Sequence, residues 1–163
     1  MNTKRSRKAI RTLAAAAAIF IGCTSASDAA PKQGLGVGII VGEPTGISFK
    51  KWTDDTHAID GAVAISLSDS DAFQLHADYL IHNFSSLSTP EMKGATPWYY
   101  GLGARLRSRN GDTHFGVRVP LGVNYLFADS PLDFFAEVAP VLDIAPKAAL
   151  DLNGAIGLRF YFK

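Results

Sequence analysis

The feature that most constrains the fold is a regular alternation of apolar with polar or small residues near the end of the chain. From Leu150 to Phe162 every second residue is apolar except Gly154, and the residues between them are Asp151, Asn153, Ala155, Gly157, Arg159 and Tyr161. Successive side chains of a β-strand point to opposite faces, so this segment has one apolar face and one face suited to a polar interior. A transmembrane β-strand, which is tilted and about 9–11 residues long, has this pattern.

Seven earlier segments alternate in the same way, and turn residues separate them. The eight segments cover residues 34–42, 47–52, 59–67, 73–82, 98–107, 115–125, 132–143 and 150–162. No helical i, i+3, i+4, i+7 spacing persists after residue 30. Eight antiparallel strands can close into a barrel without a free edge, as lipid requires. We therefore expect an all-β protein, an eight-stranded antiparallel up-and-down transmembrane β-barrel, with bulges at Pro120 and Pro140.

The first 26 residues are expected to be a signal peptide. Five basic residues and no acidic one precede an apolar run over 13–22, and small residues follow at a cleavage site near 22–29. The apolar run is too short for a helix that crosses a bilayer, which needs about 20 residues. Residues 27–33 then form a short linker, and residues 34–163 form the barrel domain.

Removal of this signal peptide changes the charge of the chain. The sequence has 16 basic and 15 acidic residues, and loss of the five basic residues of the signal leaves 11 against 15, a net charge of −4. This balance does not favour nucleic-acid binding. Cys23 is the only cysteine, which excludes an intrachain disulfide. The sequence Phe20-Ile-Gly-Cys23 resembles a bacterial lipobox, so Cys23 is either a lipidation site or an ordinary residue of a signal that is cut after Ala26 or Ala29.

Two barrels of opposite orientation share this alternation. A membrane barrel places the polar face inside, whereas a soluble barrel places the apolar face inside, with Leu75, Tyr79 and Val119 in its cavity. The polar face is rich in glycine and alanine, which suits a crowded interior, and bulky aromatic residues lie on the apolar face near strand ends, as in aromatic girdles. We therefore expect a lumen filled by a charged network of Lys50, Asp60, His76, Asp78, His82, Arg105, Arg107, Arg118, Asp133, Glu137, Asp143, Asp151 and Arg159. A narrow ion pathway through this network is the alternative to a filled lumen.

The end of the chain resembles the C-terminal assembly signal of outer-membrane barrels, because Gly157 is followed by Phe160 and Phe162. Lys163 follows the final aromatic residue, and Ala155 stands at the usual polar position. Most of the segment 34–162 is similar to an uncharacterised family of small bacterial outer-membrane β-barrel proteins with the OmpA- and OmpX-like architecture. The stretches that carry this resemblance are 42–49 (GEPTGISF), 75–79 (LHADY), 100–105 (YGLGAR), 117–121 (VRVPL) and 135–140 (FAEVAP). The resemblance implies the fold, the outer membrane, and the barrel-assembly machinery and periplasmic chaperones as partners, but no activity.

Two groups of residues invite a reading as chemical sites. His76, Asp78 and His82 share one face of a strand and could hold a metal or act as acid and base, but a single strand supplies too few converging ligands. His82-Asn-Phe-Ser85 and Ser86 invite comparison with barrel enzymes that modify lipid A, but His82 points inward in the predicted register and the tight His-x-Ser pairing is absent. We therefore predict no catalytic residue, no metal and no cofactor.

The sequence thus predicts a monomeric, non-enzymatic barrel of structural or interaction type that contacts outer-membrane lipid. With both termini in the periplasm, the external turns are 43–46, 68–72, 108–114 and 145–148, and the longest connection, 85–97, lies on the periplasmic side. A lipid A-modifying enzyme and a soluble or lipid-tethered periplasmic carrier of apolar ligands remain as alternatives.

Overall fold

The computed structural model describes residues 34–65, 73–84, 93–109 and 112–162, and all regular structure in these ranges is β-strand. The expected signal peptide with Cys23, the linker, Ser85, Ser86 and Lys163 lie outside the described residues. No helix in the described part of the chain is long and apolar enough to cross a membrane. The strands are β1 (Leu35–Gly42), β2 (Gly46–Trp52), β3 (His57–Ile65), β4 (Phe73–Asn83), β5 (Gly94–Ala95), β6 (Trp98–Arg109), β7 (Asp112–Arg118), β8 (Leu121–Phe127), β9 (Leu132–Ala145) and β10 (Ala149–Phe162).

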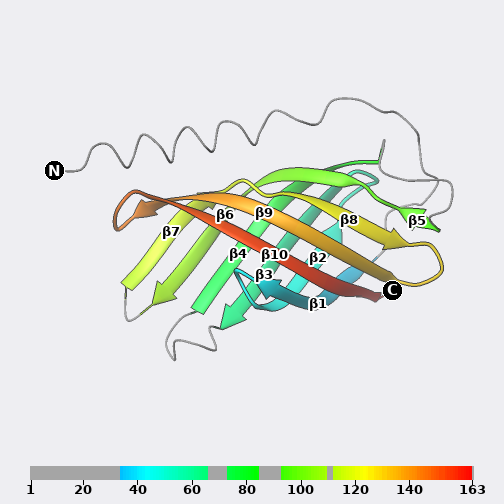
Figure 1. The fold of residues 1–163 in the computed structure, drawn as a ribbon, viewed down its shortest axis with the longest axis horizontal. Helices are drawn as coiled ribbons and strands as arrows, with labels where there is room; N and C mark the ends of the chain where they lie inside the picture. The colour runs from blue at the N-terminus through cyan, green and yellow to red at the C-terminus, as the bar shows by residue number, and fades with distance from the viewer. Residues whose placement is uncertain (1–33, 66–72, 85–92, 110–111, 163) are drawn as a thin grey trace.

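The strands form one closed antiparallel sheet (Figure 1). β1, β2, β3 and β4 pair in chain order, and β4 pairs with β6. β6 then pairs with β7, both β7 and β8 pair with β9, and β9 pairs with β10. The ring closes where β10 pairs with β1 from Leu35–Phe162 to Gly42–Ala155. Closure satisfies the backbone groups that an open sheet leaves at its edges.

Two of the eight strands in this ring are interrupted by proline, and this accounts for the ten segments. β5 and β6 hold one register against β8, since Gly94 pairs with Phe127 and Trp98 with Val123. Across the gap between them, the amide of Asn124 donates to the carbonyl of Pro97 over 2.9 Å. The segment expected as a connection over 85–97 therefore contains the start of a strand.

Pro120 interrupts the second strand, between β7 and β8, without shifting its register. Arg118 pairs with Val141 and Leu121 with Val138, and the amide of Val119 donates to the carbonyl of Pro140 over 3.0 Å. The expected bulges at Pro120 and Pro140 are wrong, because proline removes a hydrogen-bond donor but adds no residue to the strand. The register shift lies instead between Phe115 and Gly116, which face Ala145 and Asp143 and leave one β9 residue between those partners unpaired.

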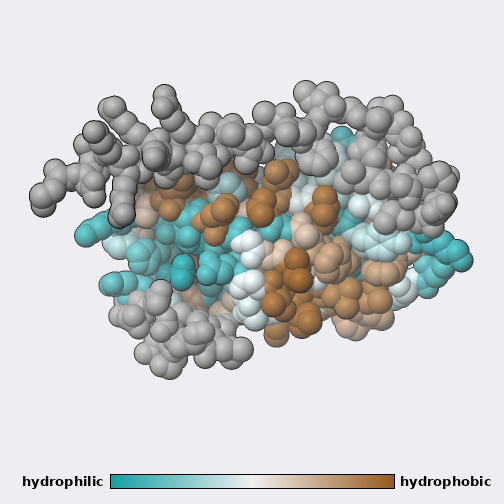
Figure 2. All heavy atoms as spheres, in the orientation of Figure 1, coloured by the Kyte–Doolittle hydropathy of each residue, from teal (hydrophilic) through white to brown (hydrophobic). Residues whose placement is uncertain are grey.

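The wall of the barrel has its apolar face outside. Leu75, Tyr79 and Val119, which a soluble carrier would place in its cavity, are 40%, 48% and 49% exposed. Charged residues such as Arg105 and Asp133 are buried within the ring instead. Figure 2 shows hydrophobic residues gathered over the middle of the visible face and hydrophilic residues more frequent toward the two ends.

Inside the ring, three aromatic side chains lie against glycines on the neighbouring strand. Tyr99 pairs with Gly122, Phe135 with Gly157, and Tyr161 with Gly36. A Cβ added at Gly122 would stand 2.5 Å from the Tyr99 ring, and one at Gly157 would stand 2.3 Å from the Phe135 ring. Glycine at these positions therefore makes room for large rings in a narrow interior, an arrangement that also pins strand register.

The height of the barrel wall varies around the ring at one of its two ends. We call the end with Leu35 and Phe162 the terminal rim, and the end with the turns at residues 43–45 and 146–148 the turn rim. At the turn rim, β10 continues past its last pair with β1, and only the hydrogen bond from the Glu43 amide to the Gly154 carbonyl follows. The β9–β10 hairpin therefore rises above the β1–β2 hairpin, with Leu150 and Leu152 on its outer face 63% and 55% exposed.

Candidate functional site

The structure places the thirteen polar residues predicted for the lumen on the inward face of the wall. Eleven of them are buried, and Arg107 and Asp151 near the turn rim are half-buried. They come from every strand of the ring except β1, because strand alternation turns one side chain in two toward the axis. Ring closure brings together residues that lie far apart in the sequence, and they form three groups along the barrel.

The first group, which we call the Arg105 cluster, lies toward the turn rim. The Arg105 guanidinium donates from Nη2 to both carboxylate oxygens of Asp143 over 2.9 Å and from Nη1 to Asp151 Oδ2 over 2.8 Å. Nη1 also donates to Asn153 Oδ1 over 3.2 Å, and Arg107 reaches Asp151 at 3.5 Å. A buried guanidinium is thereby matched by two carboxylates in good hydrogen-bond geometry, the arrangement in which such pairs are strongest.

The second group occupies the middle of the lumen and has two arginines at its centre. Arg118 donates from Nη2 to Glu137, whose other carboxylate oxygen accepts a 2.9 Å hydrogen bond from the Tyr99 hydroxyl. Arg118 Nε also lies 3.0 Å from Asp78 Oδ2. This contact is an ion pair and not a hydrogen bond, because neither atom has a hydrogen-bond partner among the described residues. Arg118 therefore joins two carboxylates from β4 and β9.

Arg159, the other central arginine, is also held by two carboxylates. Its Nη2 lies 2.6 Å from Asp60 Oδ2, its Nη1 lies 3.6 Å from Asp133 Oδ2, and its Nε donates to the Ser48 hydroxyl over 2.9 Å. The guanidinium also stacks 3.8 Å above the centre of the Phe135 ring, a cation–π contact. Asp133 accepts a further hydrogen bond of 2.8 Å from the Tyr161 hydroxyl.

The third group surrounds Lys50 toward the terminal rim. Lys50 Nζ lies 2.8 Å from His82 Nε2 and donates to Asn124 Oδ1 over 2.8 Å, and it sits 4.6 Å from the Trp52 ring centre and 5.3 Å from that of Tyr99. No carboxylate of the described residues lies within 4.0 Å of this ammonium group. His82 is thus an interior partner of Lys50 and does not face the exterior, where a lipid-modifying base would have to be.

The sequence places His76, Asp78 and His82 on one face of β4, but His82 contacts Lys50 and does not join the other two. His76 and Asp78 instead lie close to Asp60 on β3. Asp60 and Asp78 are directly opposite each other across β3 and β4, and His76 Nε2 lies 3.9 Å from Asp78 Oδ2. One ligand atom from each of the three side chains lies within 4.8 Å of the others. All three residues are at least 96% buried.

Sequence reasoning missed the uncharged residues that complete these groups. Asn124, Asn153, Tyr99 and Tyr161 are buried, and each makes a hydrogen bond to a charged lumen residue. Their only sequence signal is that they alternate on the same face as the charges. The residues of the proposed assembly signal are divided between the two faces, with Gly157 buried and Phe160 and Phe162 outward with ring centres 5.0 Å apart.

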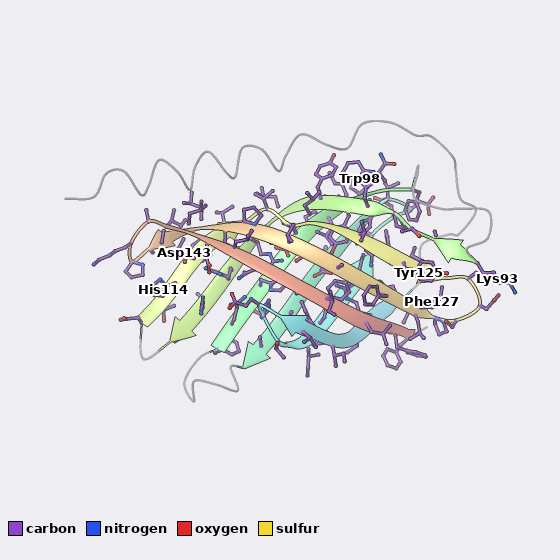
Figure 3. The ribbon with its side chains drawn as sticks, viewed as in Figure 1. Lys93, Trp98, His114, Tyr125, Phe127 and Asp143 are labelled. Atoms are coloured by element: carbon purple, nitrogen blue, oxygen red, sulfur yellow. The ribbon has the colours of Figure 1, made fainter. Side chains whose placement is uncertain are left out.

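The outer face carries its own grouping of aromatic residues. Trp98 stacks on Tyr100 at 5.6 Å and Tyr125 meets Phe127 edge-on at 4.7 Å, while the Tyr125 hydroxyl donates to the backbone carbonyl of Lys93. Figure 3 shows Trp98, Tyr125, Phe127 and Lys93 toward one end of the barrel, and His114 and Asp143 toward the other. Aromatic residues thus gather near the terminal rim.

Comparisons with known proteins address the fold alone. No protein-family model matches the chain, and no curated protein matches it. Among solved structures, the crystal structure of the N-terminal β-barrel domain of Pseudomonas aeruginosa OprF is similar, with a TM-score of 0.51 and 13% sequence identity. The match covers 81% of this chain and 100% of that domain. The chain therefore has the fold of that β-barrel domain.

Proposed function

We propose that this protein is a small bacterial outer-membrane β-barrel of non-enzymatic, structural or interaction type, whose outer face contacts lipid and whose lumen is filled by ion-paired side chains. The single observation that carries the proposal is the inverted distribution of polarity. Large apolar residues are exposed on every long strand of the ring, and charged residues are buried inside. A protein that works in water is built the other way round.

Lipid is the medium that this surface fits. Soluble monomers rarely expose contiguous apolar patches beyond a few hundred square ångströms, because such surface associates in water. In lipid the same surface carries no penalty, and a closed ring of strands leaves no backbone group unpaired toward the hydrocarbon. The aromatic side chains near the terminal rim suit the boundary between hydrocarbon and headgroups.

The outer membrane is favoured over other membranes by the ends of the chain. The expected signal peptide directs export, and the Gly157, Phe160 and Phe162 pattern resembles the assembly signal of outer-membrane barrels. Both features imply passage through the periplasm and insertion by the barrel-assembly machinery, which we propose as a transient partner. The mature barrel would then be a monomer.

A structural or interaction role is favoured over a lipid-modifying enzyme by the position of His82. Its ring is buried and hydrogen-bonded to Lys50 on the inside of the wall. A hydrolase or acyltransferase acting on lipid needs its base and nucleophile within reach of the outer surface. The filled interior, with Arg105, Arg118 and Arg159 each paired to carboxylates, favours a plug over an open pore.

The proposal is tested by locating the outer face relative to lipid in cells. Single cysteines would replace Leu75, Tyr79 or Val119 on the outer face, with Asp54 and Asp129 in turns as matched controls, all in a Cys23→Ser background. Membrane-impermeant and membrane-soluble maleimides would then be compared in the outer-membrane fraction, and folding would be checked by faster gel migration before boiling. We expect the outer-face cysteines to react only with the membrane-soluble reagent. Equal labelling of both sets by the impermeant reagent, in a soluble periplasmic protein, would contradict the proposal.

A further inference from the structure

The Asp60, His76 and Asp78 side chains bring buried polar atoms without hydrogen-bond partners close together in the lumen. Among the described residues, Asp78 Oδ1 and His76 Nδ1 are buried without a hydrogen-bond or ion-pair partner, and Asp60 Oδ2 and Asp78 Oδ2 are held by ion pairs to Arg159 and Arg118 instead of by hydrogen bonds. The His76 imidazole approaches Asp78 with its Nε2 3.9 Å from Oδ2, which is beyond hydrogen-bond distance. Buried polar groups are normally satisfied, so each such exception asks for a missing partner.

The charge around these side chains is also unbalanced. Across the middle group and the neighbouring Lys50 group, the four carboxyl groups of Asp60, Asp78, Asp133 and Glu137 accompany three basic side chains, Lys50, Arg118 and Arg159. The formal surplus, with every group ionised, is one negative charge. Such a field favours an additional cation at the point where two carboxylates stand opposite each other.

The arginines that touch these carboxylates do not depend on them. Arg118 keeps Glu137 if Asp78 turns toward a cation, and Arg159 keeps Asp133 and Ser48 if Asp60 does the same. A bound ion would therefore not leave a buried guanidinium without a carboxylate. This matters because an unpaired buried charge strongly destabilises a fold.

We propose that Asp60, His76 and Asp78 form a binding site for a first-row divalent transition-metal ion such as Zn²⁺. The donors are two carboxylates and one imidazole, a set that suits zinc, whereas magnesium and calcium prefer oxygen donors alone. Donors that share a zinc ion at about 2.1 Å stand about 3.5 Å apart, so small side-chain rotations bring the three atoms, now within 4.8 Å, into range. A single strand offers too few ligands, and the third comes from Asp60 on the neighbouring strand β3.

The site is tested by zinc binding to the full chain with Cys23→Ser, which removes a competing thiol, folded in detergent micelles near neutral pH. Isothermal titration with Zn²⁺ would be compared for the parent protein, His76→Gln and Asp78→Asn. His57→Gln and His114→Gln are matched controls, because His57 also contacts an aspartate, Asp54, but in an exposed turn. We expect one ion per chain, at least about 10-fold weaker binding in the two site variants, and unchanged binding in the controls. Excess Mg²⁺ should not compete.

Three results would overturn the proposal: no zinc binding by the parent protein, equal binding by His76→Gln, or loss of binding in a control. If the site variants fail to fold, zinc-edge X-ray absorption on the parent chain carrying His57→Gln and His114→Gln decides the question. One imidazole with oxygen donors supports the site, and two imidazoles or no imidazole overturn it. The test needs only the folded barrel, so a negative result leaves the proposed membrane location untouched.

Discussion

Two groups of charges inside the same barrel are built on opposite principles. In the Arg105 cluster, one guanidinium meets two carboxylates and an amide with hydrogen bonds of 2.8–3.2 Å. In the Asp60–His76–Asp78 group, whose His76 is the register partner of Arg105, two carboxylates face each other, and Asp78 Oδ1 and His76 Nδ1 lack partners among the described residues. Arg105 and Asp143 in the first group are buried, as are all three residues of the second.

The difference shows that burial alone does not decide whether a charged group stabilises the fold. In the Arg105 cluster, ion pairs with good hydrogen-bond geometry compensate the desolvation of the charges. Removing one partner therefore leaves the desolvation of the remaining charges uncompensated. The Asp60–His76–Asp78 group carries surplus negative charge, so losing one charge removes a repulsion together with an attraction. Stability should therefore respond strongly to mutation in the first group and weakly in the second.

The largest effect is expected for Arg105→Met. The substitution keeps the volume of the side chain but leaves Asp143 buried without its bidentate partner, so the free energy of unfolding should fall by about 3–5 kcal/mol. Urea unfolding in lipid vesicles, followed by gel migration without boiling, measures the change. Arg107→Met is the matched control, because Arg107 is half-buried and 3.5 Å from Asp151, and it should cost under about 1 kcal/mol. Equal losses of unfolding free energy in both variants would contradict the prediction that Arg105 stabilises the fold more than Arg107 does.

A smaller effect is expected for Gly122→Ala, which acts on the middle group through packing. The new Cβ would stand 2.5 Å from the Tyr99 ring and 2.6 Å from the Ala136 carbonyl, so Tyr99, which donates to Glu137, must shift. Overpacking of this kind costs about 1–3 kcal/mol. Gly154→Ala serves as the control, since its Cβ would meet only the Glu137 carbonyl, at 4.0 Å. The same unfolding assay should show no loss for Gly154→Ala, and a matching loss there would argue against the ring contact as the cause.

A weaker effect still is expected for Asp78→Asn measured with a metal chelator present. The change removes the one surplus negative charge and leaves Arg118 paired with Glu137, so the free energy of unfolding should move by less than about 1 kcal/mol. Asp143→Asn, in the balanced Arg105 cluster, should cost more in the same assay. The opposite order would show that the middle group needs every one of its carboxylates.

The smallest effect is expected outside the lumen, at the exposed turn between β2 and β3. The Asp54 carboxylate accepts the backbone amide of Thr56 and a hydrogen bond from the His57 ring, and these bonds hold the pKa of Asp54 below its ordinary value of 3.8. A depressed pKa gives stability that is present above pH 3.8 and is lost as the pH falls through the lower folded value. The advantage of the native chain over Asp54→Asn in urea midpoint should therefore shrink in acid, and a constant difference across this range would contradict the interpretation.

Much of the wall could be predicted from the sequence, because strand alternation is a local property. The faces of β4 and β10 follow directly from which residues alternate, and the all-β ring of eight strands agrees with the expectation. The continuation of a strand through Pro97 was missed, since proline ordinarily reads as a boundary when neighbouring strands are unknown. The register of the next strand through Pro120 was misjudged for the same reason.

The partners inside the lumen could not be predicted, because they depend on how the ring closes. Lys50 and Asn124 are 74 positions apart in the sequence, and Arg159 and Ser48 are 111 apart. The face that each residue occupies was visible in the alternation, but which side chains meet across the axis depends on strand tilt and register. The meeting of Asp60 with His76 and Asp78 is such a case.

The uneven turn rim has a consequence for how the protein would sit in a bilayer. The β9–β10 hairpin extends the apolar outer surface with Leu150 and Leu152 beyond the level at which the β1–β2 hairpin ends. A protein whose hydrophobic belt has unequal height either tilts in the bilayer or changes the local thickness of the bilayer. A barrel of this shape is therefore expected to lean and to deform the leaflet asymmetrically, so neighbouring molecules would approach it differently from its tall side and its short side.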